Sequence, residues 1–299
     1  MTKRPWEPFK VIPIRLMATN KMVDEDVSEK AYGRRNAKTK SNALDTVRGC
    51  VGGKTNNGYG CPWGCYSCES MKRFHRIFHI PVSMMLKEHL LRRDLDNCPD
   101  SWIRIGVNGE PGEDWPLTIR VCRIIQDHGK TPVVLTRLWN YPTPEILRDL
   151  AETGAVLQVS SCALDSDFWL SRAKDVINTY TSYKGLALLR LVTFVFKDPE
   201  LMKKQEQLYH WGGFILEQPA RLQRTNPTWE TVDQDKYKPY HDYTTGKSTN
   251  RWWTAGTLFD GPTCGDGCYK CANKCYTNVG DIKKWIKSAA PALLSVSTG

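Results

Sequence analysis

The sequence predicts an α/β fold in which short strands alternate with amphipathic helices. Two observations carry this prediction. From Trp102 to Gln218, short apolar runs alternate with segments whose apolar residues recur at helical spacing, which is the pattern of successive βα units around a parallel sheet. The chain has 299 residues, 40% hydrophobic and 25% charged, which is enough apolar material for one large core. We therefore expect one main α/β domain with a small appendage.

Six strands are expected, and they are Asp45–Cys50, Trp102–Val107, Pro132–Thr136, Val156–Ser160, Leu186–Phe196 and Gly213–Glu217. Three connecting helices have clear boundary signals. Trp115–His128 and Thr143–Glu152 each precede a glycine, and Asp198–Trp211 has Pro199 in its first turn. Six βα units are too few for a closed eight-stranded barrel. They suit a partial (βα)6 barrel of the TIM type, whose ligand sits at the carboxyl ends of the strands.

The chain divides into three parts. Residues 1–44 form an N-terminal extension, residues 45–220 the partial barrel, and residues 221–299 a linker, a small metal-binding extension and a last helix around Asp281–Leu294. The polar stretch after the barrel has no convincing period, so we expect a linker or a substrate-facing loop. Its aromatic residues, interleaved with Lys and Arg, either form a base-stacking, phosphate-binding surface or pack against one another. They are Tyr237, Tyr240, Tyr243, Trp252 and Trp253.

Charge and cysteine usage indicate the partners. Lys and Arg number 42 against 32 Asp and Glu, a net charge of +10 that favours an anionic partner such as nucleic acid, nucleotide or acidic peptide. No apolar stretch near the N-terminus approaches the roughly 18 residues that span a bilayer, so we expect no membrane partner and a cytoplasmic location. Seven of the eleven cysteines lie in two tight clusters, which suggests metal in a reducing compartment.

The first cluster, CPWGCYSC, places Cys61, Cys65 and Cys68 in a Cys-x3-Cys-x2-Cys spacing after the glycine-rich run VGGKTNNGYG. Three thiolates this close can ligate three irons of a [4Fe–4S] cluster and leave the fourth iron open to chelate a substrate. A structural zinc site wants four ligands, so zinc or incidental thiols are the weaker alternatives.

This motif, placed before a series of βα units, resembles the defining motif of the radical S-adenosylmethionine (radical SAM) superfamily over roughly residues 45–218. The resemblance implies that the three cysteines hold a [4Fe–4S] cluster whose unique iron chelates the amino and carboxylate groups of SAM. One electron, from a donor such as flavodoxin or ferredoxin, cleaves SAM to methionine and a 5′-deoxyadenosyl radical that abstracts a substrate hydrogen. The family usually has an aromatic residue directly before the third cysteine, where this chain has Ser67 and places Tyr66 one position earlier.

Gly109 and Glu110 follow the second long strand and resemble the Gly-Gly-Glu motif that holds the SAM ammonium in this family, with Asn108 in place of the first glycine. A carboxylate at a strand end pairs with an ammonium in a partly desolvated cleft, and glycine permits close backbone approach. The alternative is a solvated loop.

Further along, Ser160 is the preferred ligand for the ribose hydroxyls of SAM by the same resemblance, with Ser161 and Asp165 as alternatives. Asp165 or Ser166 would also serve as the N-cap of the next helix. Arg190, inside the apolar run LALLRLVTFVF, needs a buried anionic partner or a cleft. The SAM carboxylate is one such partner, and a snorkelling or salt-bridged arginine is the alternative.

The second cluster, CGDGCYKCANKC, contains four cysteines in twelve residues, a closed metal site that suits either an auxiliary [4Fe–4S] cluster or structural zinc. Its ligands are Cys264, Cys268, Cys271 and Cys275. Compact spacing favours iron–sulfur. The remaining cysteines, expected to be small buried hydrophobic residues, are Cys50, Cys98, Cys122 and Cys162.

Three functions follow from these patterns. The leading one is a radical SAM enzyme that modifies or rearranges a nucleoside or nucleic acid. The second is radical SAM modification of a peptide or amino-acid-like metabolite, and the third is a non-catalytic, zinc-stapled nucleic-acid-binding protein. No residue is assigned as general acid or base.

Overall fold

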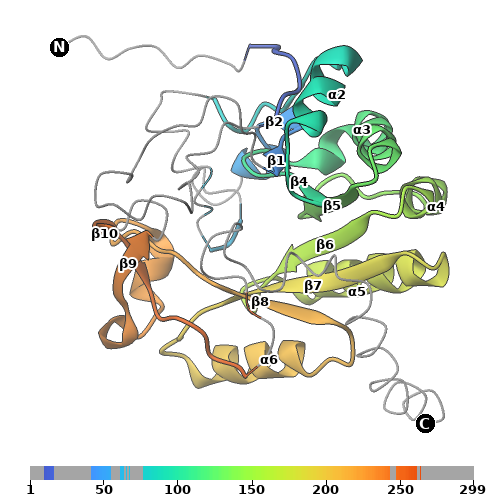
Figure 1. Ribbon diagram of the computed structural model, residues 1–299. Coiled ribbons are helices and arrows are strands. Elements are labelled where there is room, and N and C mark those ends of the chain that lie inside the picture. The colour runs from blue at the N-terminus through green and yellow to red at the C-terminus, as the bar shows by residue number, and fades with distance from the viewer. Residues whose placement is uncertain are drawn as a thin grey trace, which may run out of the picture.

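A six-stranded parallel sheet forms the centre of the protein (Figure 1). The computed structural model describes residues 10–16, 42–54, 61–63, 65, 67, 77–242, 247–260 and 263. In spatial order the strands are β1 (Ala43–Leu44), β4 (Trp102–Ile105), β5 (Thr131–Thr136), β6 (Val156–Ser161), β7 (Leu186–Thr193) and β8 (Ile215–Pro219). Every neighbouring pair is parallel, which confirms the predicted α/β class.

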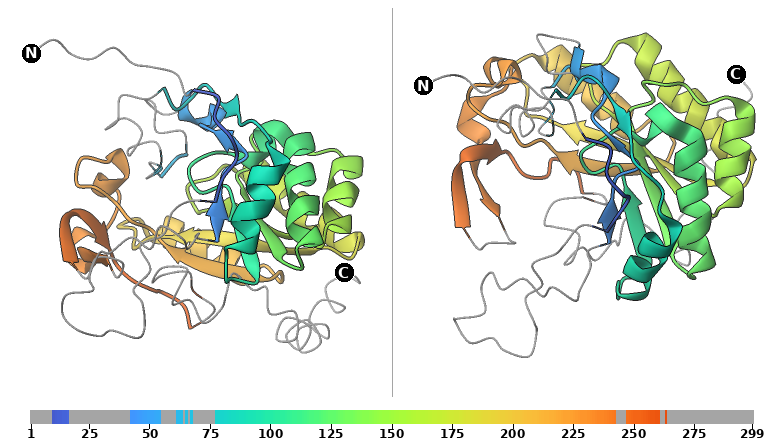
Figure 2. Two further views of the ribbon diagram at one scale, coloured as in Figure 1. Left: turned by 45° about the horizontal axis from the view of Figure 1, so that its top comes forward. Right: turned by 90° about the horizontal axis from the view of Figure 1, so that it is seen from above.

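A helix connects each strand of this sheet to the next. These helices are α2 (Glu88–Asp96), α3 (Trp115–Asp127), α4 (Pro144–Glu152), α5 (Asp167–Ser182) and α6 (Pro199–Tyr209). Crossovers between parallel strands are right-handed, so a strand order that follows the chain without reversal places all connecting helices on one face. Figure 2 shows the helices along one side of the sheet. Helices α3, α4 and α6 confirm the three predicted helices to within one or two residues at each end.

Side-chain caps fix where these helices begin. The side chains of Asp114, Thr143 and Asp198 accept hydrogen bonds from backbone N–H groups in the first turns of α3, α4 and α6, and proline follows in that turn each time. Ser166 caps α5 by accepting from the N–H of Trp169. Of the two predicted N-cap candidates for this helix, Asp165 and Ser166, it is Ser166 that caps it.

Alternation along the strands divides the core in two. The helix-facing side carries residues of the main core, among them Ile103, Ile105, Val134, Leu157, Val159, Leu189 and Leu191. The opposite face carries a separate cluster formed by Trp102, Val133, Val156, Leu188, Phe214 and Leu216. A parallel strand buried on both sides reads as a nearly continuous apolar run, which explains why these strands were visible in the sequence.

The first strand differs from its prediction. Only Ala43–Leu44 pairs with β4, whereas Val47–Arg48 forms β2 and pairs antiparallel with β3 (Val82–Ser83). The chain leaves the sheet at Asp45 because the buried carboxylate of this residue accepts three backbone N–H groups from the loop after β4. The predicted range, Asp45–Cys50, therefore started where the strand ends.

Residues 10–16 of the N-terminal extension pack onto the main domain. Ile14 and Leu16 are buried in the main core, and the Ile14 N–H donates to the carbonyl of Met85. Arg15 forms an ion pair with Asp94 of α2 through two hydrogen bonds of 2.5 and 2.6 Å.

The stretch after β8 is folded and is not a simple linker. It contains a short 3-10 helix, Pro227–Glu230, and an antiparallel pair, β9 (Lys238–Asp242) and β10 (Lys247–Thr254). Trp229, Val232 and Tyr237 are buried there against Phe194, Phe196 and other residues of a third cluster. Packing against neighbours is thus the observed role of Tyr237, and Trp253 packs partly against the same cluster.

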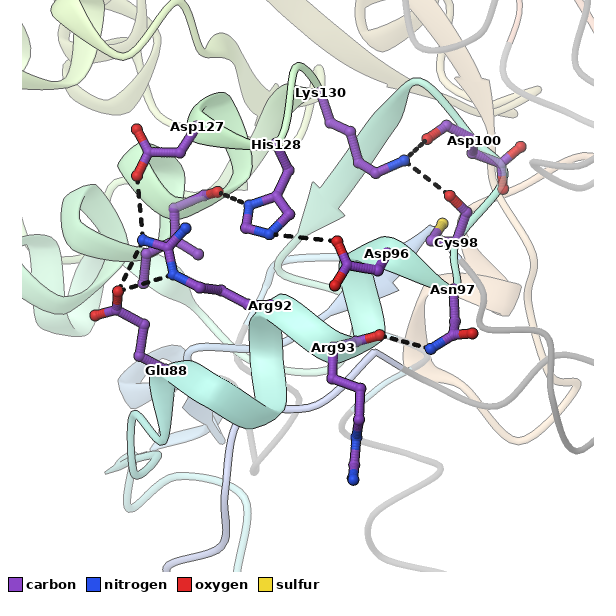
Figure 3. Close-up of polar contacts among 11 residues, drawn as sticks. Glu88, Arg92, Arg93, Asp96, Asn97, Cys98, Asp100, Asp127, His128 and Lys130 are labelled. Carbon is purple, nitrogen blue, oxygen red and sulfur yellow. Dashed lines mark hydrogen bonds and ion pairs between the residues drawn. The ribbon is translucent and has the colours of Figure 1, made fainter.

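Polar contacts join α2 to α3 at the amino end of the sheet, away from the strand ends where ligands are expected. Figure 3 shows Arg92 bridging Glu88 and Asp127, and Lys130 donating to the carbonyl oxygens of Cys98 and Asp100. Within the described ranges, no helix has the length and apolar character needed to cross a bilayer.

Candidate metal centre

The helix-free face of the sheet becomes polar toward the carboxyl ends of its strands. Two residues beyond Val156, Leu188 and Leu216 of the apolar cluster, the same face carries Gln158, Arg190 and Gln218 respectively. Ser160 lies opposite Arg190 in the register of β6 and β7. Polar side chains are costly to bury without hydrogen-bond partners. The polar residues at this end of the sheet therefore indicate a site where polar groups meet.

Cys61 and Cys65 bring their thiols together at this end of the sheet. Cys61 is 5% exposed and Cys65 is partly exposed. The pKa of Cys61 is raised, mainly by the hydrogen bond between the two side chains and secondly by burial. The nearby Arg137 opposes this rise. Residue Cys68 lies outside the described residues, so two of the three predicted ligands are placed, and these two converge.

A buried arginine, which the sequence interpretation missed, stands beside these thiols. Arg137 directly follows β5, and its guanidinium lies 4.4 Å from the centre of the Trp63 ring, between Cys61 and Cys65 in the sequence. Burial disfavours the charged form, but Asp165 and Cys61 outweigh this effect and keep the pKa of Arg137 above its usual range. The guanidinium of Arg137 therefore partly offsets the rise in the pKa of Cys61.

Asp165 is the counter-charge of Arg137. Its two carboxylate oxygens accept from the guanidinium at 2.8 and 3.0 Å, and one of them also accepts from the Ser161 hydroxyl at 2.6 Å and the Cys162 N–H at 2.9 Å. Its side chain is fully buried, as is typical of a structural bidentate pair. Asp165 thus accepts hydrogen bonds from both Arg137 and Ser161. The backbone carbonyl of Ser160 accepts a further hydrogen bond from the Arg137 guanidinium.

The loop after β4 is held by Asp45. Its Oδ1 atom accepts the N–H groups of Val107, Asn108 and Gly109 at 2.7, 3.0 and 3.4 Å. A Cβ atom on Gly109 would overlap the carbonyl oxygen of Val47, so glycine is required by close approach to the chain's own backbone. Burial raises the pKa of Asp45, although its hydrogen bonds favour the charged form.

Glu110 is turned toward the end of β5. The carboxylate is 4% exposed and accepts from Thr136 Oγ1, from the Gly112 N–H at 3.1 Å and from the Arg137 N–H at 2.8 Å. Burial raises its pKa to about 7, with these hydrogen bonds acting in the opposite direction. Glu110 therefore couples the loops after β4 and β5, and its contact with a SAM ammonium stays a prediction.

Arg190 has two amide partners. Its guanidinium donates to Gln158 Oε1 at 3.0 Å and to Gln218 Oε1. Both acceptors are neutral, and both come from neighbouring strands on the polar face. Binding of the SAM carboxylate by Arg190 stays a prediction, as does binding of the ribose by Ser160.

The cysteine loop and the loop after β4 also touch. Ser67 is buried, and its hydroxyl donates to the Val107 carbonyl at 3.4 Å. On the other side, the Pro62 carbonyl accepts from the Thr228 hydroxyl at 3.5 Å. The cysteine loop thus lies between the loop after β4 and the C-terminal appendage.

Cys264, Cys268, Cys271 and Cys275 lie outside the described residues. Thr263, which precedes Cys264 in the sequence, bridges to Glu217 of β8. The buried Glu217 carboxylate accepts from the Thr193 hydroxyl and the Leu258 N–H, both at 2.8 Å. The segment that leads to the second cysteine motif is therefore fixed to the last strand of the sheet.

Among the other cysteines, Cys98, Cys122 and Cys162 are buried, which confirms that prediction. Cys50 is only partly buried. Burial is the main cause that raises the pKa of its thiol, and the nearby Glu110 and Cys65 raise it further. It therefore belongs to the surroundings of the cysteine loop.

The donor set fits an iron–sulfur cluster as far as it is described. Two thiols converge beside the guanidinium of Arg137, which lowers the cost of the deprotonation that metal ligation requires. Searches against protein-family models and against curated proteins found no match.

Proposed function

We propose that this protein is a radical SAM enzyme, with Cys61, Cys65 and Cys68 as ligands of a [4Fe–4S] cluster. The observation that carries the proposal is the meeting of Cys61 and Cys65 beside Arg137 at the carboxyl ends of six parallel strands. When bound, the cluster supplies one electron that cleaves SAM to methionine and a 5′-deoxyadenosyl radical, which abstracts hydrogen from the substrate.

The one-sided sheet supports the finer fold prediction of a partial (βα)6 barrel. Sequential strand order with helices on one face leaves the carboxyl-end part of the other face, beyond its apolar cluster, to line a site. On that face Gln158, Ser160, Arg190 and Gln218 would orient SAM, whose carboxylate and hydroxyl groups suit cationic and amide donors.

In the same proposal, the loop of Gly109 and Glu110 approaches the SAM ammonium. Asp45 and Gly109 hold this loop against Val47, so the backbone carbonyls at the end of β4 keep fixed positions. The second cysteine motif would hold an auxiliary [4Fe–4S] cluster or zinc, and the reductant would be a flavodoxin or ferredoxin. An intracellular, cytoplasmic location belongs to this proposal.

The test compares anaerobically purified wild type with Cys61→Ala, Cys65→Ala and Cys68→Ala after addition of dithionite and SAM. We expect 5′-deoxyadenosine from the wild type only. Cys98→Ala is the matched control, because Cys98 is buried near the amino end of β4 and should retain activity. Formation of 5′-deoxyadenosine by the three motif variants would overturn the assignment.

A second comparison addresses the C-terminal motif. Cys271→Ala should lower iron content by one cluster while the first cluster remains. Unchanged iron together with one zinc per chain would make the C-terminal motif a structural zinc site. Zinc alone, with SAM left intact, would support the non-catalytic nucleic-acid-binding protein.

A further inference from the structure

A ladder of contacting aromatic rings and arginines runs from the cysteine loop to the surface. Arg137 lies 4.4 Å from the Trp63 ring and 5.5 Å from the Trp139 ring, and Trp139 meets Trp169 edge to face at 4.6 Å. Arg172 continues the ladder, 4.9 Å from the Trp169 ring. Its inner end thus lies at the candidate metal centre.

The outer end of the ladder is open to solvent. Phe168 packs edge to face on Trp169 and is 68% exposed, and Tyr141 is 44% exposed and lies 4.3 Å from the Arg172 guanidinium. Tyr141 comes from the loop after β5, and Phe168 from the first turn of α5, after β6. These two exposed rings are joined through Trp169 and Arg172, and they lie beyond the carboxyl ends of parallel strands, where open α/β sheets bind their ligands.

Arg172 has no carboxylate within ion-pair distance among the residues that the structure describes. Burial lowers the pKa of Arg172 from the ordinary value, and the neighbouring Tyr141 acts in the opposite direction. A half-buried cation held between two rings is therefore available to an anion from outside.

Unused hydrogen-bond donors line the same ladder. The Nε atoms of Arg137 and Arg172 and the Nε1 atom of Trp139 are buried and have no acceptor in the described part of the chain. A buried donor without a partner is unfavourable, so the packing of rings and guanidinium groups along the ladder is kept at an energetic cost.

We propose that this ladder, with Phe168, Tyr141 and Arg172 at its outer end, binds single-stranded nucleic acid and leads it to the cysteine loop. This inference rests on the proposed function, whose substrate class it names. The exposed rings offer stacking faces to unpaired bases, and Arg172 offers a planar cation to a phosphate.

Peptides fit this surface less well than nucleic acid. Repeated flat rings with interleaved guanidinium groups match a polymer that carries one aromatic plane and one negative charge per unit. An acidic peptide would satisfy the charge but not the rings. The chain's net charge of +10 adds long-range attraction for a polyanion.

The test measures binding of fluorescently labelled single-stranded RNA and DNA of one mixed sequence, and of the matching DNA duplex, by anisotropy on the purified full chain. Phe168→Ala and Arg172→Ala should each weaken single-strand binding about tenfold. Arg172→Lys, which keeps the charge but loses the flat guanidinium, should also weaken it. The tighter of the two single strands identifies the natural substrate class.

Two control variants match these changes in kind. Tyr183→Ala removes a partly exposed ring at the other end of α5, and Arg123→Ala removes an exposed arginine on α3. Both should bind within about twofold of wild type. Polyglutamate should compete poorly with the labelled strand.

Equal binding by the ladder variants and the wild type would overturn the inference, as would duplex binding as tight as single-strand binding. Strong competition by polyglutamate would likewise show a surface selective for charge alone. These outcomes do not depend on SAM cleavage, which is measured separately on the wild type. A protein that cleaves SAM but fails the binding test would therefore retain its enzyme class and lose this substrate.

Discussion

The guanidinium of Arg137 lies 4.4 Å from the centre of the Trp63 ring, which joins the end of strand β5 to the segment between Cys61 and Cys65. The same guanidinium forms a bidentate pair with Asp165, beyond the end of β6. Two neighbouring strands therefore position the cysteine loop through one buried cation. The local charge at Cys61 and the placement of its loop depend on the same residue.

Arg137→Met should destabilise the protein strongly. The change leaves the Asp165 carboxylate buried without its cation, and breaking a buried pair in this way costs about 3–5 kcal/mol. Chemical denaturation of the apo protein measures the loss, and iron content after reconstitution should fall with it. Arg123→Met, an exposed arginine on α3, is the control and should change stability by less than about 0.5 kcal/mol. A near-neutral Arg137→Met would contradict the role given to this pair.

Asp45→Asn should loosen the loop after β4. An amide oxygen accepts less strongly than a carboxylate, and three backbone N–H groups share Oδ1 of Asp45, so we expect a loss of about 1–3 kcal/mol. Hydrogen exchange at the amides of Val107, Asn108 and Gly109 should accelerate more than exchange elsewhere. Asp235→Asn, an exposed residue, should leave all three rates unchanged. Unaltered exchange in Asp45→Asn would mean that this loop is held by other contacts.

Gly109→Ala should destabilise the protein through a steric clash. The added methyl group would overlap the Val47 carbonyl oxygen, and overpacking of this kind costs about 1–3 kcal/mol or more. Gly129→Ala is an informative comparison, because Gly129 has a positive φ of 66° but open space around its Cβ position. Thermal unfolding should therefore show a larger loss for Gly109→Ala than for Gly129→Ala. A larger loss of stability for Gly129→Ala would mean that the loop after β4 can shift to accommodate the added methyl group.

Glu110 should make stability depend on pH. Burial raises its pKa from the ordinary value of 4.5 to about 7, so the folded protein keeps a proton that the unfolded chain loses near pH 4.5. The contribution of Glu110 to the free energy of unfolding is complete below that pH and is lost as pH rises through about 7. The expected difference is about 3 kcal/mol.

The measurement is urea denaturation of wild type and Glu110→Gln at a series of pH values between about 4 and 8. Glu110→Gln removes the titrating group and leaves a neutral side chain of similar shape among the same donors. The informative quantity is the slope of the free energy of unfolding against pH, which should be shallower in the variant. Parallel curves for the two proteins would show that Glu110 titrates near its ordinary value.

Much of the fold was predictable because its signals are local. The buried strands of the sheet are apolar runs, and α3, α4 and α6 carry capping residues and prolines that mark their first turns. The first strand was misplaced because Val47–Arg48 has a strand-like pattern that serves a different pairing, with β3. Register between strands far apart in sequence is not encoded locally.

The candidate site was predictable only in part. Cysteine spacing singled out Cys61 and Cys65, whose thiols the structure brings together. Arg137 follows an ordinary strand, and nothing beside it in the sequence shows that its partner, Asp165, lies 28 residues away. Residues 221–251 were predicted to be a linker or a substrate-facing loop because their apolar residues, such as Trp229 and Val232, are few and irregularly spaced. Their burial depends on Phe194 and Phe196, which only the folded chain brings to them.

The most direct test of the central claim is the metal and SAM chemistry of the wild-type protein. Iron, zinc and labile sulfide are measured on anaerobically purified protein, and the same sample then receives dithionite and SAM. The account predicts about four irons per chain from the first motif, or about eight with an auxiliary cluster, together with 5′-deoxyadenosine. Zinc without sulfide, and SAM recovered intact, would contradict it.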